Sequence, residues 1–421
     1  MIICFLFLFK YIENEKVIKI PFHTIYNETE LNINNIMVNI YKSKIGTEIE
    51  IGNSLIKCNL SFFTQSYNTF LLGEGSNIKI KPLFNKSKSI SYKSISKNKT
   101  FYNEYFSSGE YGEDNLKIKE INLKKTYFIL TNVIANNYKD EIITPLSIGL
   151  KLRNAYNLQN LENMTFLYQL QQKEKLSNQI FYFKFLNDKE GEFVIGENPY
   201  LNNNFLYTRT GKFYDGSQDL DWGFNFDKIY YGDKEINSEY DGIFSIEQFF
   251  IIATDNFFND IKNYFFDNHK TCYLNISSFE SFRKLKFFIC EKNTNISEFK
   301  TIKFYIKYNN FTFEFNHKDL FFEYNDKLFF GIVNIKTARK EIVLGRIFLK
   351  KYLLYFDNDK KVIGFLNSNN KTDFNEILYL VFVIVIILII ILFLYIYLNI
   401  KKIRKKRLNE LDDNYDYLEK I

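Results

Sequence analysis

Residues 342–365 read IVLGRIFLKKYLLYFDNDKKVIGF, the most specific pattern in the sequence. Between residues 45 and 367 the chain contains many short runs of apolar, aromatic and β-branched residues, and Gly, Asn, Asp or Ser separates one run from the next. One of these runs lies within residues 342–365. The clearest runs are residues 47–51, 77–81, 126–130, 180–186, 192–196, 311–315, 328–333 and 352–357. Helical patterns are fewer, the best being at residues 165–175 and 255–266. Alternation with a period of two between turn residues predicts an all-β fold.

The length and composition favour a large folded protein with more than one compact part. At 421 residues, the chain is about 2.8 times a typical domain length of roughly 150 residues, which permits two sizeable lobes plus appendages. The aromatic fraction of 19% supplies ample core material and argues against disorder. The formal net charge of +6 is spread along the chain, so no nucleic-acid-binding surface is expected.

The stretch at residues 342–365 resembles the closing segment of pepsin-like aspartic peptidases, in which I-L-G-x-x-F-L-x-x-Y-Y-x-x-F-D precedes R-x-G-F-A. Further segments resemble motifs of this family and follow the family's order. They are residues 47–52, 84–92, Tyr105 as the flap tyrosine, 112–114, 191–196 and 221–234. The resemblance spans residues 45–367 and implies a bilobal, all-β, pepsin-like fold. We expect an N-terminal lobe at residues 45–210 and a C-terminal lobe at residues 211–367.

The resemblance also implies two catalytic Asp residues, one in each lobe, within an Asp-Thr/Ser-Gly motif. Two carboxylates about 3 Å apart cannot both ionise, so one acts as a base and the other as an acid. Neither Asp-Thr-Gly nor Asp-Ser-Gly occurs in this sequence. Aligned on the flanking segments, the two catalytic positions hold Phe63 and Ile246, and Gln65 and Gln248 replace the turn glycines. Because neither Phe nor Ile accepts a proton, we expect no catalytic residue here.

Three carboxylates near the second motif are poor substitutes for the missing pair. Asp241 lies five residues too early, and Asp255 lies nine positions too late. Glu247 is adjacent to the motif, but the period of two along a strand points its side chain to the opposite side. An active membrane-bound aspartic endopeptidase with an unrecognised pair is therefore the alternative, and a non-catalytic pseudopeptidase is the expectation.

The inter-lobe cleft is expected to be an apolar groove that holds an extended peptide without cutting it. The partner would be a peptide or a protein, and the sequence leaves the oligomeric state open. A second alternative is a structural surface protein whose cleft is closed. The residues expected at the cleft and flap are Phe63, Thr64, Ser66, Phe70, Tyr105, Ile246 and Phe249.

The cysteines and histidines indicate a disulfide and no metal site. In an oxidising lumen, Cys272 and Cys290 are expected to pair and contribute about 3 kcal/mol, which leaves Cys58 as an apolar core residue. Three dispersed His residues and no Cys-x-x-Cys or His-Glu-x-x-His motif predict neither metal nor cofactor. Nine Asn-x-Ser/Thr sequons permit N-glycosylation, at Asn27, Asn59, Asn85, Asn98, Asn163, Asn275, Asn295, Asn310 and Asn370.

Residues 377–398 read ILYLVFVIVIILIIILFLYIYL, which predicts a single transmembrane helix. Its 22 residues span about 33 Å as a helix, enough to cross a hydrocarbon core of roughly 30 Å. Lys401, Lys402 and Arg404 follow it, so the positive-inside rule assigns residues 399–421 to the cytosol and the ectodomain to the lumenal or extracellular side. Residues 1–20 begin with a short apolar run that fits a signal peptide; an uncleaved or wrongly assigned start is the alternative.

Overall fold

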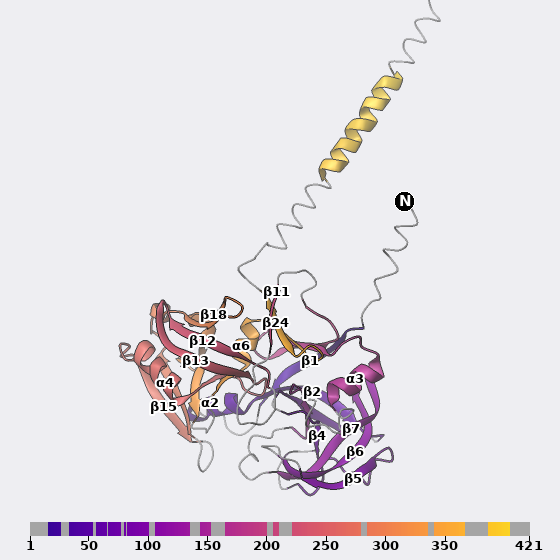
Figure 1. Cartoon of the computed structure of the whole chain (residues 1–421), viewed down its shortest axis with the longest axis vertical. Helices are drawn as coiled ribbons and strands as arrows, with labels where there is room; N and C mark the ends of the chain where they lie inside the picture. Colours follow the sequence, from indigo (N-terminus) through magenta and orange to yellow (C-terminus); the bar gives the residue numbers. More distant parts are fainter. Residues whose placement is uncertain are drawn as a thin grey trace, which may run out of the picture. The chain divides into compact units, whose positions relative to one another are not determined.

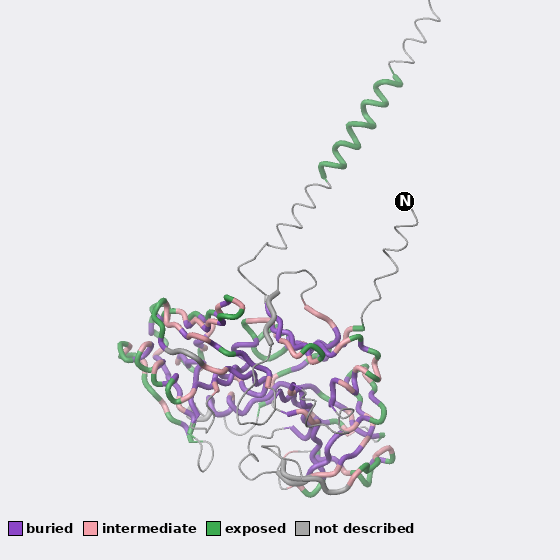
Figure 2. The backbone as a smooth tube through the Cα atoms, in the orientation of Figure 1, coloured by how far each residue is buried: buried purple, intermediate pink, exposed green. Residues whose placement is uncertain are grey.

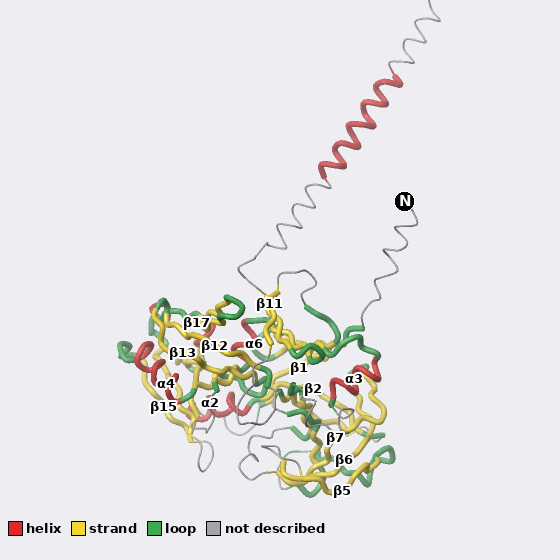
Figure 3. The backbone as a smooth tube through the Cα atoms, viewed as in Figure 1, coloured by secondary structure: helices red, strands yellow, loops and turns green. Residues whose placement is uncertain are grey.

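The structure is a computed structural model, and most of the described chain lies in strands. It describes residues 16–26, 33–53, 56–64, 66–76, 80, 82–100, 106–134, 144–152, 165–199, 205–209, 221–278, 284–335, 341–366 and 386–404. The chain divides into two compact units, Met1–Leu366 and Asn367–Ile421. Strands dominate the first unit, as the yellow segments of Figure 3 show, so the expected all-β class is confirmed.

Thirteen strands form the first sheet, in the order β11-β24-β23-β9-β10-β1-β2-β3-β8-β4-β7-β6-β5, with a further pairing between β2 and β6. The N-terminal strands are β1 (Ile18–Ile25), β2 (Lys44–Ile51), β3 (Ile56–Phe63), β4 (Phe70–Leu72), β5 (Lys93–Thr100), β6 (Phe106–Ile118), β7 (Ile121–Ile134) and β8 (Leu146–Gly149). The others are β9 (Ile180–Phe185), β10 (Glu190–Ile195), β11 (Phe205–Arg209), β23 (Leu354–Asp357) and β24 (Val362–Leu366).

Eleven strands form the second sheet, in the order β18-β17-β12-β13-β22-β14-β21-β16-β20-β19, with β15 paired to β16. Its first strands are β12 (Gly223–Tyr231), β13 (Lys234–Phe244), β14 (Ile251–Ala253), β15 (Cys272–Ser278), β16 (Lys284–Glu291) and β17 (Ile302–Ile306). Its later strands are β18 (Phe311–Phe315), β19 (Phe321–Tyr324), β20 (Lys327–Phe330), β21 (Ile332–Ile335) and β22 (Ile342–Leu344).

The two lobes repeat one arrangement of four strands. In the first lobe, β3 runs parallel to β8, and β4 lies between β8 and β7 and runs parallel to β7. In the second lobe, β13 runs parallel to β22, and β14 lies between β22 and β21 and runs parallel to β21. Figure 1 shows the two groups of strands, with β4 to β7 in one lobe and β12, β13 and β15 in the other. The bilobal architecture expected from the sequence is therefore confirmed.

The strands at the ends of the unit depart from a simple division at residue 210. All strands of the second sheet fall within residues 223–344, but β23 and β24 return to the first sheet. Strand β1 also belongs to the first sheet, and its buried Ile18 and Ile20 overlap the segment 1–20 expected as a signal. Residues 1–15 and 210–220 lie outside the described residues.

Short helices connect the strands. They are α2 (Ile33–Lys42), α3 (Phe166–Glu174), α4 (Asp255–Ile261) with the π-helix η3 (Lys262–Phe266), the 3-10 helix η4 (Ile296–Glu298), α5 (His317–Leu320) and α6 (Arg346–Lys351). Thr254 caps α4, since its hydroxyl accepts a hydrogen bond from Phe257 N at 3.3 Å. The helices expected at residues 165–175 and 255–266 are confirmed, whereas α2 was not expected.

Aromatic side chains fill the core and connect the first sheet to the segment that enters the second. Trp222 is fully buried, with its ring 5.9 Å from Phe181 of β9 and 5.2 Å from Phe356 of β23. Its indole N–H donates to Leu150 O at 2.8 Å, which satisfies the polar edge of the ring. The purple segments of Figure 2 show that buried backbone runs through both lobes.

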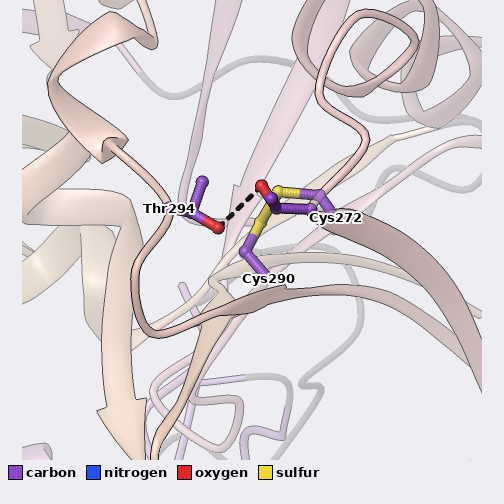
Figure 4. The surroundings of a disulfide bond; sticks show 4 residues. Cys272, Cys290 and Thr294 are labelled. Carbon is purple, nitrogen blue, oxygen red and sulfur yellow. Dashed lines mark hydrogen bonds between the residues drawn. A yellow bond between two sulfur atoms is a disulfide. The ribbon is translucent and has the colours of Figure 1, made fainter.

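A disulfide closes the β15–β16 hairpin. Cys272 and Cys290 are bonded and face each other in the strand register, 18 residues apart in sequence, so the expected pair is confirmed. Thr294 Oγ1 donates to Thr271 Oγ1 at 2.8 Å beside the bond (Figure 4). Cys58 is buried and burial raises the pKa of its thiol to about 12, as expected of an apolar core residue.

The second unit contains one apolar helix. Residues Ile386–Arg404 form 19 residues of helix with exposed Ile, Leu, Phe and Tyr side chains, and it is long and apolar enough to cross a membrane. Nineteen residues span about 28 Å, close to a hydrocarbon core of roughly 30 Å. The helix overlaps the predicted span of 377–398, of which residues 377–385 lie outside the described part of the chain.

Candidate functional site at the junction of the two lobes

The strand register identifies which positions of the two lobes are equivalent. Phe63 pairs with Gly149, while Phe244 pairs with Leu344 and thus sets Ser245 beside Gly345. A second pair of positions supports this equivalence. Phe70 lies seven residues after Phe63, on the strand β4 that pairs with β8. Ile252 lies seven residues after Ser245, on the strand β14 that pairs with β22. The register therefore makes Ser245 the counterpart of Phe63.

This register differs by one residue from the sequence expectation, which set Ile246 opposite Phe63. Ile246 is fully buried one residue further along. The segment between Phe244 and Ile251 is a turn and carries no strand periodicity, so counting inward from its two ends in sequence does not fix the position of one residue. Neither register supplies an Asp, because Ser245 is as unable as Ile246 to act as an acid–base carboxylate.

Glu247 is the carboxylate at the junction, contrary to the expectation that its side chain points away. It follows Ser245 by two residues, and Ser245 Oγ donates to Glu247 Oε2 at 2.8 Å. Both residues are buried, with exposed fractions of 3% and 1%. The turn explains the difference: Gln248 N donates to Ser245 O at 3.2 Å, so residues 245–248 are not extended and the strand period of two does not apply to Glu247.

Thr64 links the two lobes through its hydroxyl. Its Oγ1 lies 2.9 Å from Glu247 Oε2 and 3.1 Å from Phe244 O, and it accepts from Ile246 N at 3.2 Å. The single hydroxyl hydrogen serves one of the two acceptors at a time. Thr64 is also buried, so the turn after β3 and the turn after β13 are joined by a dry polar contact.

Two buried cations, Lys44 and Arg346, lie near this contact. Lys44 Nζ is 3.5 Å from Glu247 O and 6.0 Å from the centre of the Phe63 ring. Arg346 Nη2 donates to Ser43 O at 2.9 Å and to Ser43 Oγ at 2.5 Å. Burial lowers the pKa of Arg346 to about 10, and electrostatic interactions with Tyr26 and Glu247 oppose this shift. The junction is thus positively charged around one carboxylate.

The other carboxylates considered from the sequence are engaged elsewhere. The carboxylate of Asp241 accepts from Asn225 Nδ2, and burial raises its pKa. Asp255 Oδ1 accepts from Asn334 Nδ2 at 3.0 Å. Among the described residues, only Glu247 has a carboxylate hydrogen-bonded to Thr64 or Ser245. The described part of the chain also holds no group of three His, Cys, Asp or Glu side chains that could bind a metal ion.

Most of the residues expected to line an open groove are buried. The exposed fractions of Phe63, Phe70 and Ile246 are 4%, 1% and 0%, and Ser66 is buried with its Oγ 3.4 Å from Asn68 O. Phe249 is half-buried and lines a cavity. Tyr105 and Gln65 lie outside the described residues. The apolar groove expected at Phe63, Phe70 and Ile246 is therefore not open in this structure.

Helix α2 brings a segment of the first lobe against the second lobe. It lies between β1 and β2 of the first sheet in sequence, yet it packs against β15 of the second sheet. Its side chains are buried or half-buried from Ile36 to Lys42, with no exposed face. A helical stretch whose described side chains are all covered is an internal element and not a surface one. Ser43, which follows it, is the residue that accepts from Arg346.

The two lobes repeat the same four-strand arrangement, and the loops after the equivalent strands β3 and β13 contact each other. This is the architecture of a two-lobed aspartic peptidase domain. The family model described as eukaryotic aspartyl protease matches residues 45–368. The chain therefore belongs to the eukaryotic aspartyl protease family. A comparison with curated proteins finds no match.

Sequence reasoning missed Ser245, α2 and the two buried cations. Helix α2 had a clear signal, because Ile33, Ile36, Met37, Ile40 and Tyr41 repeat at helical spacing. The burial of Lys44 and Arg346 had none, since charged residues are normally exposed.

Proposed function

We propose that this chain is a membrane-anchored, non-catalytic member of its family that binds a peptide or protein without cleaving it. The observation that carries the proposal is the pair of equivalent positions: Phe63 in one lobe and Ser245 in the other. Peptide hydrolysis by a carboxylate pair needs one group to take a proton from water and another to donate one. Neither position supplies such a group.

The chemistry of Glu247 supports the same conclusion. Its Oε2 is within hydrogen-bond distance of the hydroxyls of Thr64 and Ser245. Glu247 is 1% exposed, and no second carboxylate of the described residues is hydrogen-bonded to either hydroxyl, so this contact provides no acid–base pair. A lone buried carboxylate held in this way is a structural link between the lobes.

The proposed membrane anchor is the apolar helix Ile386–Arg404, with the cytosolic tail after it and the family domain in the lumen or outside the cell. Lys401, Lys402 and Arg404 at its end support this orientation through the positive-inside rule. The Cys272–Cys290 disulfide fits an oxidising compartment on the side of the family domain.

A second candidate is a structural surface protein whose cleft is closed. The burial of α2 against the second lobe favours it, because a helix packed there leaves less room for an extended peptide. Binding is the first candidate because Phe249, one of the expected cleft residues, lines a cavity with walls from both sheets.

The experiment that separates these functions measures retention and cleavage together. The full chain in detergent micelles is incubated with a random hexapeptide library, and the bound and free peptides are identified by mass spectrometry. We expect intact peptides in the bound fraction and no cleavage products. Cleavage products that vanish in a Glu247→Gln variant would assign catalysis to this carboxylate and refute the proposal. An empty bound fraction would favour the closed-cleft candidate.

A further inference from the structure

A cavity of about 340 Å³ lies beside the junction, and its walls come from both sheets. Phe185 of β9 and Asp188 of the following turn form one wall. Phe322 of β19, Phe249 and the first turn of α6 form the other. A volume of this order suits a small ligand or the end of a peptide, since ligand sites begin at roughly 300 Å³.

Arg346 is the polar group of this cavity whose bonding is incomplete. Its exposed fraction is 3%, and only Nη2 is bonded, to Ser43. Nε and Nη1 are sealed from solvent and have no hydrogen-bond partner among the described residues. The Phe249 ring, 5.3 Å from the guanidinium carbon, lies over the group. Because buried donors without partners are costly, this arrangement indicates a missing acceptor.

The charges around the cavity favour an anion. Four basic and two acidic side chains line it, which leaves a balance of +2. The two carboxylates are engaged, because Asp188 pairs with Lys350 and Asp319 pairs with Lys351. Lys318 is exposed at the cavity, and Arg346 lies deeper. An incoming anion would therefore meet Lys318 first and the guanidinium last.

The remaining lining is apolar and aromatic. Phe249 and Phe322 are half-buried, and their rings are 6.0 Å apart with an edge-to-face orientation. Phe185, on the other wall, is also half-buried. A ligand that satisfied Arg346 would thus place its uncharged part against exposed ring faces. Glu247 is not this acceptor in the structure, because Nε and Nη1 of Arg346 have no hydrogen-bond partner among the described residues, and Glu247 Oε2 contacts Thr64 and Ser245.

We propose that this cavity binds a carboxylate that carries an aromatic or large apolar group, with Arg346 as its charged partner. The guanidinium offers its unpartnered Nε–H or Nη1–H to such a group, as a charge-assisted hydrogen bond to a carboxylate oxygen. Phe249 shifts from its place over the guanidinium when the carboxylate enters. If the ligand is a peptide, the inference rests on the proposed peptide-binding function. The carboxylate would then be the C-terminus of the peptide or one of its acidic side chains.

The test compares an acid with its neutral analogue. The full chain in detergent micelles is titrated with N-acetyl-L-phenylalanine and with N-acetyl-L-phenylalanine amide, and calorimetry gives both Kd values. The acid should bind at least about tenfold more tightly, because a charge-assisted bond is lost in the amide. Arg346→Met should bring the two Kd values to within about twofold, and Lys318→Ala should weaken acid binding about threefold. Lys307→Ala, a matched change of an exposed lysine away from the cavity, should have no effect.

Equal Kd values for the acid and the amide, or no binding of either, would overturn the inference. This comparison uses the unaltered chain, so it stays valid if the Arg346→Met variant does not fold. Two peptides separate the two sources of the carboxylate. One ends in Phe with a free C-terminal carboxylate, and the other has an amidated C-terminus and an internal Glu next to Phe. The peptide that binds more tightly identifies the source. Hydrolysis of any peptide would refute the proposed function while leaving the Kd comparison valid, so the two failures are distinguishable.

Discussion

The hydroxyl of Thr64 is predicted to hold the two lobes together, and Thr64→Val removes it with little change in shape. The substitution orphans the buried Ile246 N–H, which donates to Thr64 Oγ1 at 3.2 Å. It also removes the 2.9 Å contact to Glu247 Oε2. An orphaned buried donor costs about 1–3 kcal/mol, and a hydrogen bond to a charged group contributes about 1.5–3 kcal/mol. We therefore expect the free energy of unfolding to fall by about 3 kcal/mol.

Urea unfolding followed by the fluorescence of Trp222 measures this change, because Trp222 is the single Trp of the chain and is fully buried. With a slope of about 3 kcal/mol per molar, the midpoint should fall by about 1 M. Thr69→Val is the matched control, since Thr69 Oγ1 is buried and has no partner among the described residues. Its midpoint should stay the same or rise. A Thr64→Val midpoint equal to that of Thr69→Val would refute the reasoning.

The other predictions concern the disulfide, the buried thiol and the anchor. Replacing Cys272 and Cys290 by Ser should lower the unfolding free energy by about 3 kcal/mol, from the entropy of an 18-residue separation; an unchanged urea midpoint would contradict it. In a Cys4→Ser background, Cys58 should resist a thiol-reactive dye at about pH 8 until urea unfolds the chain, because its pKa is raised to about 12. This raised pKa also predicts that stability falls as pH rises from about 9 towards 12, since the unfolded thiol deprotonates first, and a flat stability profile in this range would argue against it. A chain ending at residue 370 should appear in the soluble fraction, whereas the full chain should resist carbonate extraction; a membrane-bound truncation would contradict the anchor.

The strands were predictable because each buries one set of alternating side chains. The run at residues 311–315 matches β18 (Phe311–Phe315) residue for residue, with Phe311, Phe313 and Phe315 buried. The closing stretch at residues 342–365 likewise contains β22, α6, β23 and all but the last residue of β24. Where the buried side chains of a strand alternate, the apolar residues of the sequence identify the strand and its buried face.

The site was less predictable because its residues lie in turns and in unusual environments. Ser245 and Glu247 follow β13 in a segment without periodicity, so only the pairing of Phe244 with Leu344 fixes their positions. Lys44 and Arg346 are buried because partners from distant segments surround them, and Arg346 contacts Ser43 across 303 residues. Such contacts are set by tertiary packing, which no local pattern encodes.

Hydrolysis by the full chain tests most directly the proposal that the chain has no catalytic carboxylate pair. A quenched peptide library is incubated with the chain in detergent micelles at each pH from about 3 to 7, with and without pepstatin. Folding at each pH is verified by the fluorescence of Trp222, which is buried in the native structure. We predict no turnover at any pH. Pepstatin-sensitive turnover by the folded chain would contradict the account.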